Sequence, residues 1–138
     1  MINMKKRMII AIMIVCILVI GVIEWRTKKD FNIDATKVSE IIIDETMDNV
    51  KVEVSEDDQI HVSFYEGVSY HYNINEENKI LTIMGNNRIP ITLDVQCPYL
   101  IIRVPKDYGK SIKINTEKNC SIDESIQWKD VQINSEND

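Results

Sequence analysis

The chain has 138 residues, of which 44% are hydrophobic, 7% aromatic and 28% charged, and its formal net charge is −6 at pH 7. This length fits one globular domain with an accessory segment and argues against two separate cores. From Glu24 onward there are 13 Lys or Arg and 22 Asp or Glu, a balance of −9. An acidic domain lacks the basic face that neutralises phosphates, which argues against nucleic acid as a partner.

The first segment is an uncharged apolar run of sixteen residues, Met8 to Ile23, with cationic residues on both sides. As a helix it measures about 24 Å, and Trp25 with snorkelling Lys and Arg side chains extends it toward the ~30 Å of a bilayer core. The sequence therefore predicts a transmembrane anchor over residues 8–25, which makes the lipid bilayer a partner. A cleaved signal peptide or lipid attachment at Cys16 stays open, although the small residues that both processes need are missing.

Cationic residues are almost equally numerous before and after the apolar run, so the charge bias alone leaves the orientation open. A long downstream domain crosses the membrane largely regardless of its charge, which favours residues 1–7 in the cytoplasm. We therefore expect a single-pass protein of the cell membrane. Residues 26–37 are predicted to form a polar stalk, and residues 38–138 an extracytoplasmic domain.

Alternating apolar residues dominate the chain after the stalk and indicate half-buried strands. The apolar sets are Val50, Val52 and Val54; Ile60, Val62 and Phe64; Tyr70, Tyr72 and Ile74; Ile89, Ile91, Leu93 and Val95; Leu100, Ile102 and Val104; Ile112 and Ile114. Turn-forming clusters separate them, and the strand centres recur about every ten residues. This pattern predicts an all-β fold, assigned here to a short-strand β-solenoid or stacked-sheet domain behind one transmembrane helix. The same spacing also occurs in β-sandwiches.

Three consecutive acids, Glu56, Asp57 and Asp58, lie between two of these strands. A turn tip favours such residues, and we expect a hairpin turn rather than a calcium site, because three successive residues cannot all face one ion. The two histidines, His61 and His71, fall on the polar face. A hairpin through Gly67 would place Tyr65 opposite His71, so the two imidazoles would not meet.

The cysteines and short motifs of the sequence do not indicate a catalytic, metal-binding or phosphate-binding site. Cys97 and Cys120 could pair outside the cell, and the sequence leaves this open. Neither zinc-binding spacing nor a nucleophile elbow nor a glycine-rich phosphate loop is present. We therefore predict no enzyme, with no catalytic, cofactor-binding or metal-binding residues and no cofactor.

The segments "SEIIIDETMDNVKVEVSEDDQIHVSFYEG" and "LDVQCPYLIIRVPKDYGKSIKINTEKNCSIDES" resemble the bacterial putative-adhesin family of domains of unknown function. The matching features are the strand pair around the acidic turn and the Val104–Lys106 element before Tyr108. The resemblance covers Val38 to about Ile133. It implies a β-strand-repeat domain that is often tethered to the membrane at the cell envelope, and it carries no catalytic residues.

Together these features predict a non-enzymatic, membrane-tethered envelope protein whose β-domain binds a partner in an accessory, sensing or adhesion-like role. An envelope protein or a wall polymer would be that partner. The alternatives are a carbohydrate-active β-solenoid enzyme that uses paired acids on an envelope polymer, and a purely structural unit that self-associates. The last strand, near "DVQINS", ends the chain without a visible cap, so self-association through this edge is expected as well.

Overall fold

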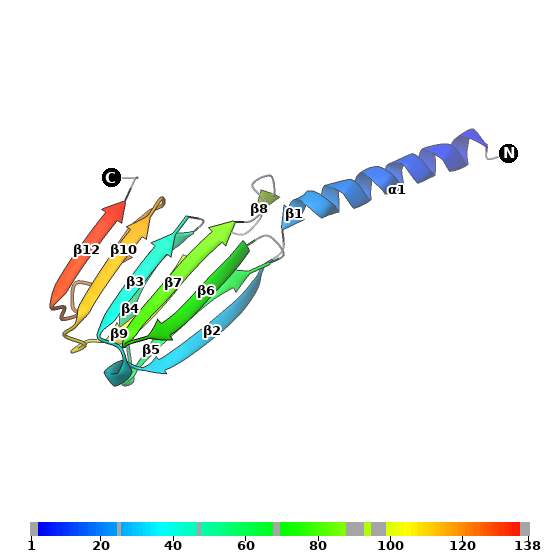
Figure 1. Cartoon of the computed structure of the whole chain (residues 1–138). Coiled ribbons are helices and arrows are strands. Elements are labelled where there is room, and N and C mark those ends of the chain that lie inside the picture. The colour runs from blue at the N-terminus through cyan, green and yellow to red at the C-terminus, as the bar shows by residue number, and fades with distance from the viewer. Residues whose placement is uncertain are drawn as a thin grey trace.

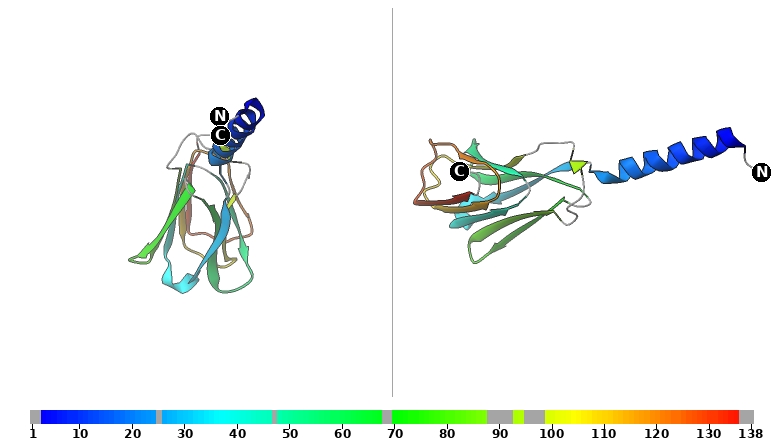
Figure 2. Two further views of the ribbon diagram at one scale, coloured as in Figure 1. Left: turned by 90° about the vertical axis from the view of Figure 1, so that its right-hand side faces the viewer. Right: turned by 90° about the horizontal axis from the view of Figure 1, so that it is seen from above.

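The structure is a computed structural model that describes residues 3–24, 26–46, 48–67, 70–87, 93–94 and 99–135. A helix, α1 (Met4–Val22), projects from a β-domain made of two facing layers (Figures 1 and 2). The short strand β1 (Ile23–Glu24) follows the helix and pairs in parallel with β8 (Leu93–Asp94).

Each layer is a five-stranded sheet. In spatial order, sheet I consists of β12 (Asp130–Ser135), β10 (Ser111–Thr116), β3 (Glu40–Glu45), β7 (Ile80–Asn87) and β6 (Tyr70–Glu77). Sheet II consists of β11 (Cys120–Ile122), β4 (Asn49–Ser55), β9 (Tyr99–Pro105), β5 (Gln59–Glu66) and β2 (Thr27–Asp34). A single 3₁₀ turn in the described chain, Ala35–Lys37, connects β2 to β3.

Both sheets are mixed. Pairing is parallel from β12 to β7 in sheet I and from β11 to β9 in sheet II. It is antiparallel between β7 and β6, between β9 and β5, and between β5 and β2. Strands that are consecutive in the chain are mostly not neighbours, since β3 lies between β7 and β10, and β9 lies between β4 and β5.

The predicted fold class is wrong in two respects. The domain is a sandwich of two mixed sheets instead of a solenoid, because later strands insert between earlier ones instead of stacking coil by coil. The sandwich was among the architectures that the strand spacing left open. In addition, no helix in the described residues is both long enough and apolar enough to cross a membrane, which overturns the predicted transmembrane helix.

The segment expected to be a stalk belongs to the sandwich. Thr27–Asp34 is β2, and all eight of its residues pair with β5 along the edge of sheet II. Asp34 then caps the 3₁₀ turn, because its carboxylate accepts a hydrogen bond from the backbone N–H of Thr36 at 2.9 Å. The folded domain therefore begins near Arg26, twelve residues before Val38, where the sequence placed its start.

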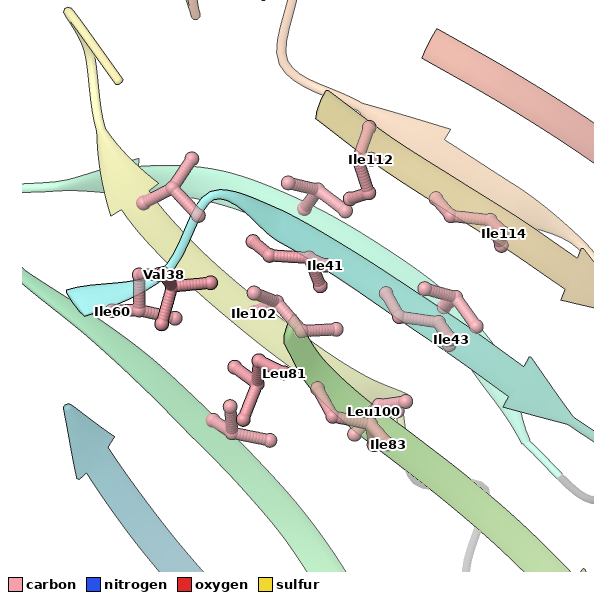
Figure 3. Close-up of a cluster of buried hydrophobic side chains, with 14 of the residues drawn as sticks. Val38, Ile41, Ile43, Ile60, Leu81, Ile83, Leu100, Ile102, Ile112 and Ile114 are labelled. Atoms are coloured by element: carbon pink, nitrogen blue, oxygen red, sulfur yellow. The ribbon is translucent and has the colours of Figure 1, made fainter. Parts of the chain in front are cut away.

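The core consists of aliphatic rows that run across the strands in register. One row of sheet I is Leu81, Ile41, Ile112 and Val131; the next is Ile74, Ile83, Ile43, Ile114 and Ile133. The corresponding row of sheet II consists of Ile122, Val52, Ile102, Val62 and Phe31. Figure 3 shows members of these rows, among them Ile41, Ile83 and Ile102, lying between the strands of the two layers. The alternation predicted the inward face of these strands correctly.

The two ends of the sandwich differ. At the end formed by β6 and β2, which we call the closed end, the rings of Phe64 and Tyr72 lie 5.1 Å apart across the layers. At the end formed by β12 and β11, which we call the open end, sheet II offers only the three residues of β11. Val131 and Ile133 continue the core rows there but are 40% and 46% exposed.

This difference can be measured with two substitutions in the same row. Ile114 is fully buried, whereas Ile133, its neighbour across the ladder, has nearly half of its surface in water. We expect Ile114→Ala to lower the free energy of unfolding by about 2–5 kcal/mol and Ile133→Ala by less than about 1 kcal/mol. Urea unfolding at low protein concentration gives both values, and equal losses would show that the open end is covered.

Candidate functional site

A buried charged cluster lies between the sheets on the side of the closed end. Its members are Arg26, Glu45, Asp48 and Tyr72, from three separate parts of the chain. The guanidinium of Arg26 donates two hydrogen bonds to Asp48, at 2.9 Å and 2.7 Å, and a third to the backbone carbonyl of Tyr65 at 2.8 Å. It also lies over the ring of Tyr70, with 4.2 Å to the ring centroid. These contacts fix the chain that follows α1 onto both sheets.

Tyr72 reaches this cluster across a glycine. Tyr72, Gly85 and Glu45 are in register on β6, β7 and β3, so the tyrosine ring must pass over the middle strand to reach Glu45. A Cβ atom on residue 85 would lie 2.7 Å from a ring carbon of Tyr72 and 2.5 Å from both carboxylate oxygens of Glu45. Only glycine allows this approach.

The hydroxyl of Tyr72 lies 2.5 Å from a carboxylate oxygen of Glu45 and 2.5 Å from one of Asp48. Burial, followed by the charges of Glu45 and Asp48, raises the pKa of Tyr72 far above its usual value, so the phenol keeps its proton. One phenol proton cannot serve both contacts, so one carboxyl group must donate a proton of its own. Asp48 already accepts two hydrogen bonds from Arg26, which assigns this extra proton to Glu45.

The cluster is thus a chain of hydrogen bonds from Glu45 through Tyr72 to Asp48 and Arg26. In this assignment the phenol of Tyr72 donates to Asp48, and the carboxylate of Asp48 is paired with the guanidinium of Arg26. Glu45 is fully buried, and Asp48 and Arg26 are each only 5% exposed, so no substrate reaches these groups. The cluster therefore serves to orient and close the sandwich. The sequence analysis did not predict this cluster, because Arg26 looks like one of the cationic residues that flank the apolar segment and Asp48 looks like a turn residue.

A matched pair of substitutions tests this proton assignment. Glu45→Gln keeps the shape of a protonated glutamic acid and its donor to Tyr72, so we expect it to change the free energy of unfolding by less than about 1 kcal/mol. Asp48→Asn removes the carboxylate that pairs with the buried guanidinium of Arg26 and should cost about 3–5 kcal/mol. Urea unfolding at neutral pH measures both. Equal losses would show that Glu45 is ionised.

The acidic cluster of the sequence is a turn between β4 and β5, although not the expected hairpin, because β9 lies between these strands. Asp57 organises it. Its carboxylate accepts hydrogen bonds from the backbone N–H of Gln59 at 2.9 Å and from the Ser55 hydroxyl at 2.8 Å, and it lies 2.8 Å from Nε2 of His61. The N–H of Gln59, then His61 and Ser55, lower the pKa of Asp57 to about 2. These contacts account for the residue as a turn former.

The lowered pKa of Asp57 predicts an acid-dependent contribution to stability. A carboxyl group whose pKa falls from 3.8 to about 2 on folding stabilises the native state above pH 3.8, and this contribution disappears as the pH falls through about 2. The difference in unfolding free energy between the native chain and Asp57→Asn should therefore shrink toward zero over that interval. Denaturant unfolding as a function of pH measures it, with Asp58→Asn as the control. A difference that does not change over that interval would contradict the assignment.

The two histidines lie on different sheets. His61 is on β5 and contacts Asn32 at 2.6 Å through Nδ1, whereas His71 is on β6 and lies 3.6 Å from the carboxylate of Glu66. The predicted pairing of Tyr65 with His71 is wrong, because the chain changes sheets between β5 and β6 and His71 pairs with Asn86 instead. Within the described ranges, no three His, Cys, Asp or Glu residues are grouped so that they could hold a metal ion.

Cys120 is a half-buried free thiol at the start of β11, and burial raises its pKa to about 11. Cys97, and most of the strand predicted around Ile91, lie outside the described residues. The Val104–Lys106 element ends β9, and the following Tyr108 packs edge-on against Trp128 while its hydroxyl donates to the carbonyl of Val38 at 3.0 Å. This element closes the core under the 3₁₀ turn.

The sandwich has four strand edges, and they are protected to different degrees. Natural sheets guard edges with charged residues or by keeping the edge strand short. β2 carries Lys28, Lys29, Asp30 and Asp34, β6 carries Glu76 and Glu77, and β11 has only three residues. β12 has six residues, one charge at Asp130, and the exposed Val131 and Ile133. It lies uncovered at the margin of sheet I in Figure 1 and is the edge best suited to accept another strand.

Comparison with known proteins supports the fold alone. No protein-family model matches the chain, and no curated protein matches it. A crystal structure of a putative cell adhesion protein from Clostridium sporogenes is similar, with a TM-score of 0.51 and 8% sequence identity over 80% of this chain. The match covers 57% of that protein, so the present chain spans little more than half of its length. The resemblance noted in the sequence is thus supported by the fold of one distant neighbour, without a family match.

Proposed function

We propose that this protein is a non-catalytic binding domain of the cell envelope and that it binds by accepting a β-strand on the free edge of β12. The observation that carries this proposal is the open end, where two core rows continue to Val131 and Ile133, which stay 40% and 46% exposed because the edge strand of sheet II there, β11, has only three residues. A strand added at this edge gains backbone hydrogen bonds and covers both side chains. The similarity in fold to a putative cell adhesion protein is compatible with a binding role.

The location at the membrane is part of the same proposal. The described side chains of α1 include Ile9, Ile12, Ile14 and Val15, each more than half exposed to solvent. Contact with lipid would remove this apolar surface from water at a gain of about 25 cal/mol per Å². We assign this helix to association with the bilayer and the β-domain to the extracytoplasmic side.

Photocrosslinking in intact cells tests the binding edge. A photoreactive amino acid at Gln132, an exposed residue of β12, should give a crosslinked adduct of the tagged chain. The same amino acid at Asn75, an exposed residue of β6 at the closed end, should give none. Ile133→Lys should abolish the adduct at position 132, because an ammonium group would then lie in the covered row.

The same cells provide the control for location. Protease added outside should remove a C-terminal tag from intact cells if the β-domain is extracytoplasmic, and lysed cells show that the tag can be cleaved. Protection of the tag in intact cells would overturn the assignment to the envelope. Equal adducts at positions 132 and 75 would overturn the binding edge.

A further inference from the structure

We propose that the strand bound at β12 is β12 of a second copy of this chain, paired antiparallel about a two-fold axis at Gln132; this inference rests on the binding edge proposed above. Such pairing would join the two copies of sheet I into one continuous sheet. A contact of this kind is isologous, because the same strand serves both partners, so it closes after two copies.

The distribution of charge favours a second copy at this end. Residues 106–138, which include β10, β11 and β12, contain five Lys and seven Asp or Glu, a balance of −2. Residues 27–105, which form the other strands of the two sheets, contain seven Lys or Arg and fourteen Asp or Glu. Two copies that meet at β12 therefore join their less acidic parts and keep their more acidic parts apart. Contact through β2 or β6 would bring the acidic parts together.

The residues of β12 match themselves in one register. Opposed residues of an antiparallel pair lie on the same face, so Val131 can face only an odd-numbered residue of the same strand in the second copy. With Gln132 opposite Gln132, Val131 faces Ile133 twice, and Asp130 faces Asn134 twice. Both apolar pairs then extend the core rows, and no like charges are opposed. A register centred on Ile133 would place Val131 opposite Ser135 and lose one apolar pair.

The strength of this contact follows from its size. A pairing of five residues on each strand covers less than the ~1,200 Å² that stable interfaces bury, so the dimer should depend on protein concentration. The two exposed side chains of each copy, Val131 and Ile133, contribute two apolar cross-strand pairs to the contact. We expect a reversible dimer.

Cysteine substitutions test the register. Opposed residues have Cα atoms about 4.5–5.5 Å apart, within the reach of a disulfide. Gln132→Cys in the full chain should therefore form a disulfide-linked dimer on mild oxidation, with the 132–132 bond identified by mass spectrometry. Asn134→Cys is the matched control, because the proposed register places it opposite Asp130. Ile133→Lys in the Gln132→Cys background should abolish the crosslink without loss of the β-sheet signal in circular dichroism.

Two results would overturn the second copy as the bound strand. One is a Gln132→Cys chain that stays monomeric in sedimentation and forms no disulfide at any concentration. The other is equal crosslinking of Gln132→Cys and Asn134→Cys. The photocrosslink at position 132 separates this inference from the proposed function. An adduct that contains another protein in place of a second copy would overturn the dimer and leave the binding edge standing, whereas no adduct would remove both.

Discussion

The aliphatic rows that cross the strands in register are the constraint on which the rest of this structure depends. Each row needs its β-branched residue at the same height on every strand, because a shift of one residue would turn the apolar set toward solvent. Ile83, Ile43 and Ile114 meet this requirement across three parallel strands of sheet I. Parallel strands cannot be joined by tight hairpins, so the chain alternates between layers and later strands insert between earlier ones.

Next to the two aliphatic rows lies a third inward row that is largely polar. It runs from Tyr72 over Gly85 to Glu45 and on to Thr116 and Ser135. Buried polar groups require partners, and Tyr72 finds one in Asp48, which is in turn paired with Arg26. The missing side chain at Gly85 leaves the space in which Tyr72 approaches Glu45. The charged cluster is thus the polar boundary of the core. It also fixes the entry of the chain from α1 into the sandwich.

The two ends of the sandwich differ because the aliphatic rows are covered at one end and partly exposed at the other. At the closed end, aromatic rings and charged edge strands cover the rows, so β2 and β6 resist further pairing. At the open end, sheet II stops at a strand of three residues while sheet I continues to β12, which leaves Val131 and Ile133 in water. Most of the acidic surplus of the chain lies before residue 106, in the segment that forms the strands other than β10, β11 and β12. A strand added at the open end therefore meets one charged residue on β12, Asp130, and less repulsion between acidic segments than a strand added at β2 or β6.

Local alternation determined which residues face inward, because a strand has a period of two whatever its neighbours. The local sequence also determined that the acidic residues around Asp57 form a turn, because the hydrogen bonds of Asp57 to Ser55 and Gln59 join residues only two positions apart. The order of strands was decided only by the tertiary structure, because a spacing of ten residues carries no information about which strand inserts next to which. The same holds for the charged cluster and for β2. Arg26, Glu45, Asp48 and Tyr72 come together only when two sheets face each other, and Thr27–Asp34 becomes a strand only when β5 offers a partner edge.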